Sequence, residues 1–128
     1  MNYSSNIKFK KNEATLEELL SVQPMLLHIF SYFVQCCDEQ KLPILITSIR
    51  GEAVGRNSRT HREGRAIDIA TRNFSSLQCN RIAFELNSKF AQDYGTSPVH
   101  GTKRVCVYGD PKHLDHFHLQ VRRNINIF

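Results

Sequence analysis

At the centre of the chain stands the run Arg65-Ala66-Ile67-Asp68-Ile69-Ala70, in which isoleucines alternate with other residues. Successive side chains of a β-strand point to opposite faces of a sheet, so this alternation predicts a strand. A second run, His116-Phe117-His118-Leu119-Gln120-Val121, has the same period. Its phenylalanine and leucine are predicted to enter the core, and its two histidines to share the opposite face.

The segments around these two runs predict an α+β fold. Thr15-Leu16-Glu17-Glu18 has the pattern of a capping box, which places the start of a helix near Leu16. Apolar residues at three- and four-residue spacing predict further helices over 25–37 and 77–90. Strands are predicted over 44–49 and 104–108, loops over 51–64 and 94–103, and a tail or edge strand over 1–12. We therefore expect a small, mostly antiparallel sheet of about four strands with helices packed on one side.

Composition is that of one globular domain over residues 1–128. The chain is 41% hydrophobic and 23% charged, which argues against disorder over most of its length. Its net charge is +5, which favours anionic partners without choosing among nucleic acid, anionic lipid and an acidic cell envelope. The basic residues are spread along the chain and do not form a consecutive run.

The cysteine spacing and the N-terminal segment predict the cell compartment in which the chain is made. The four cysteines contain no Cys-x-x-Cys pair, so we expect reduced, mostly buried thiols. The segment Met1–Asn6 has no apolar signal core, and no stretch approaches the about 20 apolar residues of a membrane span. We expect a monomer that is cytoplasmic at synthesis, without a membrane span.

Residues whose side chains could bind a metal or take part in catalysis occur in two clusters, over 58–69 and 114–119. Asp68 lies between two isoleucines, and a carboxylate in an apolar strand needs a partner. A metal ion is one such partner, and Arg50 or Arg65 is the structural alternative. His116 and His118 follow Asp115, which fits either a metal site or a solvent-facing edge strand. Together the clusters hold the residues of a mononuclear zinc hydrolase, with ligands, a general base and an arginine for the oxyanion.

Three segments resemble one known family. His61-Arg62-Glu63-Gly64-Arg65-Ala66-Ile67-Asp68 is similar to the His-x-x-Gly-x-Ala-x-Asp motif of the D-alanyl-D-alanine carboxypeptidases and dipeptidases, a family that includes the L-alanyl-D-glutamate endopeptidases used as phage endolysins. Asp115-His116-Phe117-His118 resembles the second motif, in which two residues separate an acid from a zinc-binding histidine. Thr47-Ser48-Ile49-Arg50 resembles the Ser-x-Arg strand end before the first motif. The resemblance covers about residues 44–121.

This resemblance implies a zinc peptidase that cuts a bond next to a D-amino acid in peptidoglycan stem peptides. The implied zinc ligands are His61, Asp68 and His118. Asp115 is the implied catalytic acid and base, and Arg50 the implied contact to substrate and transition state. Whether the enzyme is a carboxypeptidase or an endopeptidase stays open, because cleft loops decide it.

Other positions in the two motifs could contact substrate. The family often has serine two residues before the first histidine, where this chain has Arg59 with Ser58 and Thr60 on either side. The possible substrate-binding residues are Ser58, Thr60, Tyr108 and His116. If His116 were the ligand, the acid position would fall on His113, so the family spacing favours His118.

Two other classes of function remain as alternatives. The signalling domain of hedgehog proteins resembles the same zinc fold, which allows an inactive zinc-binding module; Asp115 at the base position argues against it. A nucleic-acid-binding domain would interleave aromatic residues with arginines. The basic segment over 51–64 contains no aromatic residue, so we expect no nucleic-acid partner.

Overall fold

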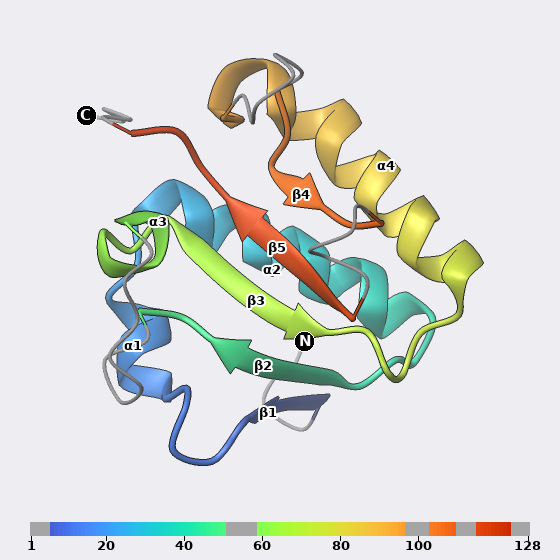
Figure 1. Cartoon of the computed structure of the whole chain (residues 1–128). Helices are drawn as coiled ribbons and strands as arrows, with labels where there is room; N and C mark the ends of the chain where they lie inside the picture. The colour runs from blue at the N-terminus through green and yellow to red at the C-terminus, as the bar shows by residue number, and fades with distance from the viewer. Residues whose placement is uncertain (1–5, 51–58, 97–102, 110–114, 124–128) are drawn as a thin grey trace.

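The computed structural model describes residues 6–50, 59–96, 103–109 and 115–123, and shows an α+β fold built on a five-stranded mixed sheet (Figure 1). The strands lie in the order β1-β2-β3-β5-β4. Their bounds are β1 Ile7–Phe9, β2 Ile44–Ser48, β3 Ala66–Ala70, β4 Cys106–Val107 and β5 His116–Gln120. Only the β1–β2 pair is parallel; β2–β3, β3–β5 and β5–β4 are antiparallel. The α+β class is confirmed, and the fifth strand is the N-terminal segment, which forms an edge strand.

Two of the described helices are long, and two are short. Their bounds are α2 Pro24–Glu39 and α4 Ser76–Tyr94, and the short helices are α1 Leu16–Leu20 and α3 Arg59–Arg62. Figure 1 shows α2 behind the sheet and α4 beside β4. The Thr15 side chain caps α1 by accepting a hydrogen bond from the Glu18 amide, at 3.1 Å. The described helices include none with the length and apolarity needed to cross a membrane.

The short helix α3 was not predicted. It lies within the segment 51–64 that was predicted as a loop, and residues 51–58 of that segment lie outside the described part. Strand β4 is shorter than predicted, because Arg104 forms an isolated bridge with Thr96 and the strand begins at Cys106.

The hydrophobic core fills the space between the helices and one face of the sheet. Phe117 and Leu119 are fully buried, as the alternation in β5 predicted. The ring of Phe33 in α2 meets Phe117 edge to face, with centroids 5.2 Å apart. His116 and His118, which alternate with Phe117 and Leu119 in β5, therefore lie on the opposite face of the sheet. One face of the sheet is thus apolar and covered by helices, and the other carries the polar side chains.

An irregularity in β2 brings a further polar residue to this second face. Ile46 pairs with Ile69, whereas Ser48 pairs with Asp68, so the register shifts between the two pairs. A bulge of this kind inserts one residue and turns the following side chains to the other face. Ile46 therefore stays in the core while Ser48, which is buried, shares the face of Asp68.

Burial of the four thiols predicts a loss of stability at alkaline pH. Cys36, Cys37, Cys79 and Cys106 are buried and form no disulfide. Burial raises the pKa of each thiol above its ordinary value of 9.0, and that of Cys36 to about 12. Above pH 9 the unfolded chain releases protons that the folded chain keeps, so the free energy of unfolding falls as pH rises. We expect a decline of up to about 1.4 kcal/mol per pH unit for each thiol, measured by urea unfolding between pH 9 and about 12.

The control for this measurement is Cys106→Ala. Removing one buried thiol should make the decline with pH shallower, whatever it does to stability at neutral pH. An equal slope in the variant and the wild type would show that the thiols do not cause the decline.

Candidate metal centre

His61 lies in α3 with its ring fully buried, and the end of β2 fixes its orientation. Its Nδ1 is 2.6 Å from the main-chain carbonyl oxygen of Ile49. A carbonyl accepts hydrogen bonds, so Nδ1 carries the proton and Nε2 presents its lone pair. Nε2 is 3.3 Å from Asp68 Oδ2 but has no hydrogen-bond partner among the described residues. A buried imidazole held by a carbonyl through one nitrogen, with its other nitrogen presented, is the usual arrangement of a metal-binding histidine.

Asp68 and His118 face each other across the sheet. They are paired residues of β3 and β5, and His118 Nδ1 lies 2.8 Å from Asp68 Oδ1. The Asp68 side chain is only 5% exposed. Burial alone would raise the pKa of Asp68, but the hydrogen bond from His118 outweighs it, so this pKa lies below its ordinary value. Asp68 is therefore ionised in the folded chain at neutral pH.

These three residues form one cluster that could hold a metal ion. One ligand atom from each of His61, Asp68 and His118 lies within 4.8 Å of the others. In a tetrahedral zinc site with bonds of about 2.1 Å, ligand atoms are about 3.4 Å apart. The distance of 3.3 Å between His61 Nε2 and Asp68 Oδ2 is close to that value. Two imidazoles and a carboxylate suit a divalent metal, and the cluster by itself does not fix which one.

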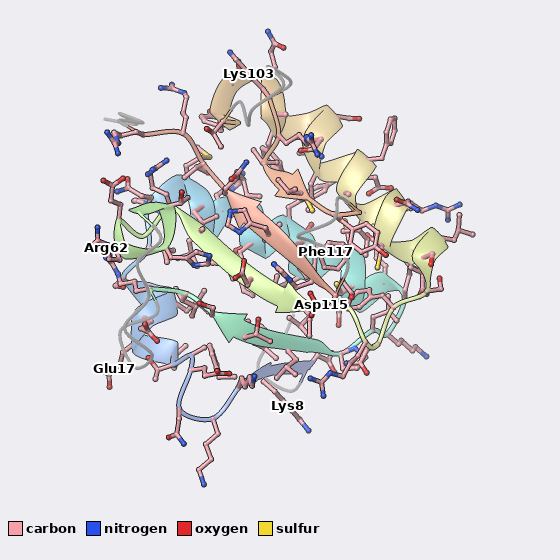
Figure 2. All side chains as sticks on the ribbon, in the orientation of Figure 1. Lys8, Glu17, Arg62, Lys103, Asp115 and Phe117 are labelled. Carbon is pink, nitrogen blue, oxygen red and sulfur yellow. The ribbon has the colours of Figure 1, made fainter. Side chains whose placement is uncertain are left out.

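His116 links Asp115 to this cluster. His116 Nδ1 lies 2.8 Å from Asp115 Oδ1, and His116 Nε2 lies 4.0 Å from Asp68 Oδ1. The main-chain carbonyl of Asp115 accepts a hydrogen bond from the amide of Thr71, which anchors the start of β5 to the end of β3. Figure 2 shows Asp115 beside the start of β5. The Asp115 carboxylate is 93% exposed, and the hydrogen bond from His116 lowers its pKa.

Arg50 is bound to the main chain of two helices. Its guanidinium donates to Ser21 Oγ and to the carbonyl oxygens of Ser21 and Arg62. The sequence had predicted a contact to substrate for this residue. The described contacts of Arg50 tie it to the C-terminal ends of α1 and α3, and the contact to substrate stays a prediction.

The remaining predicted site residues have different placements. Thr60 is half-buried in α3, directly before His61. Tyr108 packs on Phe117, with ring centroids 5.5 Å apart. Because Phe117 points into the core, the structure does not bring Tyr108 to the metal cluster. Ser58 lies outside the described residues.

Sequence reasoning missed the contribution of Ile49. It acts through its main-chain carbonyl, which no residue type reveals. The only available signal was its place in Thr47-Ser48-Ile49-Arg50, at the end of the strand before the first motif.

Comparisons of the chain with protein-family models, with curated proteins and with solved structures gave no match.

Proposed function

We propose that this chain is a zinc-dependent peptidase that hydrolyses a peptide bond next to a D-amino acid in peptidoglycan stem peptides. The observation that carries the proposal is the convergence of His61, Asp68 and His118 in one cluster, in which His61 and Asp68 are buried and His118 is half-buried. These three residues stand at the ligand positions of the two motifs that resemble the D-alanyl-D-alanine carboxypeptidase and L-alanyl-D-glutamate endopeptidase family. A second carboxylate, Asp115, is joined to the cluster through His116.

The donor set supports zinc and a catalytic role for it. Two imidazole nitrogens and one carboxylate oxygen are typical ligands of catalytic zinc, whereas structural sites use four protein ligands and are rich in cysteine. All four cysteines of this chain lie among the buried residues of the hydrophobic core, on the helix side of the sheet. Zinc held by His61, Asp68 and His118 would supply a Lewis acid that activates water and polarises the scissile carbonyl.

The protein's own residues would move the proton. Asp115 is exposed, and the hydrogen bond from His116 lowers its pKa below the ordinary value of an aspartate, so at neutral pH it is ionised and in the base form. It would accept a proton from the attacking water and pass it to the leaving amine, without a covalent intermediate. The hydrogen bond from His116 would hold the carboxylate in place, and its exposure would let substrate reach it.

An inactive zinc-binding module of the same fold is the second candidate. The observation that favours it is the place of Asp115, which lies outside the three-residue cluster and is linked to it through His116, as suits a site that holds a metal without a base beside it. Such a module would bind zinc with the same three residues and present the surrounding surface to a partner.

The test is release of new amino groups from purified peptidoglycan. The chain is loaded with zinc, shown by elemental analysis to hold one ion, and compared with the same chain after chelation and after zinc is restored. We expect release with zinc, none after chelation, and recovery on restoration. Mass spectrometry of the fragments would identify the bond, and a synthetic stem peptide with L-residues in place of D-residues should stay intact.

Other results would lead to different conclusions. One bound zinc per chain without amino-group release would favour the inactive module. Cleavage of the all-L peptide would contradict the proposed substrate class. Failure to bind zinc would reject both candidates.

A further inference from the structure

We propose that Arg50 is a positioning residue of the metal centre, which keeps His61 in its ligating orientation by fixing the main chain of α3. This inference rests on the metal cluster and not on peptidase activity. It differs from the role that the sequence motif implied, which was a contact to substrate and transition state.

The guanidinium joins two helix ends. Arg50 Nε donates to Ser21 Oγ at 2.8 Å and Nη2 donates to the Ser21 carbonyl at 2.8 Å, at the C-terminal cap of α1. Arg50 Nη1 donates to the Arg62 carbonyl at 2.7 Å, at the end of α3. A guanidinium has five N–H donors in a rigid planar fork, so these three bonds fix its plane. The residue that follows His61 is thereby tied to α1.

The neighbouring residue holds the His61 ring itself. The Ile49 carbonyl accepts from His61 Nδ1 at 2.6 Å, so two consecutive residues after β2 fix the ring of the histidine and the backbone of the residue that follows it. A small error in ring orientation would move Nε2 away from Asp68, with which it makes a 3.3 Å contact. Partners that orient metal-binding histidines typically contribute about 10–100-fold to metal affinity.

The main chain at Gly64 makes room for this arrangement. Gly64 has a φ of +72°, and a Cβ there would lie 2.7 Å from Arg50 Nη2 and 3.3 Å from Val22 Cα. The guanidinium cannot move aside without losing its bonds to Ser21 and Arg62. Gly64, which lies between His61 and Asp68 in the motif, therefore leaves room for the Arg50 guanidinium and also allows the turn into β3.

Charge and geometry make opposite predictions for Arg50→Gln. Removing a positive charge near a cation site should tighten metal binding, because like charges repel. Loss of the positioning bonds should weaken it. The direction of the change in zinc affinity therefore separates the two effects.

The experiment measures the zinc dissociation constant by competition with a chromophoric chelator for wild type, Arg50→Gln and Arg62→Gln. Arg62→Gln is the matched control, since it removes one exposed charge from α3 and leaves the Arg62 carbonyl in place. We expect Arg50→Gln to weaken zinc binding about 10–100-fold and Arg62→Gln to change it less than about twofold. Unchanged or tighter binding by folded Arg50→Gln would overturn the proposal.

Arg50→Lys covers the case in which Arg50→Gln does not fold. It keeps the charge and the aliphatic stem, but one ammonium group cannot reproduce the planar fork. We expect zinc binding about tenfold weaker, and affinity equal to wild type would equally overturn the proposal. Nitrogen NMR of His61 gives an independent readout, because the population protonated at Nδ1 should fall in the metal-free variant. Wild-type tautomer populations would count against Arg50 as the cause.

Discussion

Asp68→Asn is expected to weaken zinc binding by more than about 100-fold, beyond the range for partners outside the ligand set. The amide keeps the size of the side chain but removes the negative charge between His61 and His118. The asparagine side chain also has one neutral oxygen and one NH₂ group in place of two carboxylate oxygens. One of the two imidazoles would therefore face the NH₂ donor. The three ligand atoms that now lie within 4.8 Å would no longer form a suitable set.

Thermal unfolding gives the second measurement of this prediction. A ligand that binds only the folded chain stabilises it by about 4 kcal/mol at 1,000 times its dissociation constant. Zinc should therefore raise the unfolding temperature of the wild type and leave that of Asp68→Asn almost unchanged. Asp93→Asn, which makes the same chemical change at an exposed position in α4, should respond as the wild type does. A zinc affinity for Asp68→Asn within tenfold of wild type would exclude Asp68 as a ligand.

The strand pattern predicted one part of this site, the shared face of His116 and His118, and the family resemblance supplied the proposed ligands. Alternation placed His116 and His118 on one face of β5 and Phe117 in the core, and the burial of Phe117 confirms that assignment. Pairing of β3 with β5 then brings Asp68 opposite His118. A two-residue period involves only neighbouring residues, so it can be recognised in a single sequence.

The surroundings of the site depend on contacts between distant segments, and these could not be predicted. Arg50 reaches Ser21, which is 29 positions away in the sequence, and nothing at either position signals the pairing. The short helix α3 has too few residues to show a helical period. The bulge that turns Ser48 toward the face of Asp68 comes from the register of β2 against β3.

Asp115→Asn is expected to lower the rate of stem-peptide hydrolysis about 10²–10⁴-fold, which is the usual contribution of general acid–base catalysis. The amide can still interact with His116 but cannot take a proton from water. Asp115 lies outside the three-residue ligand cluster, so zinc affinity should stay within about twofold of wild type. The loss should appear mainly in kcat, because the proton moves in the transition state.

Three outcomes of this substitution have different meanings. Loss of activity with zinc retained would identify Asp115 as the base, and Asp115→Glu, which keeps a carboxylate, should recover part of the rate. Loss of both zinc and activity would show that Asp115 shapes the metal site, since a carboxylate 93% exposed in the structure would then have to turn inward when zinc binds. Full activity in Asp115→Asn would exclude it as the base and leave His116, which lies between Asp115 and Asp68, as the nearest residue able to exchange the proton.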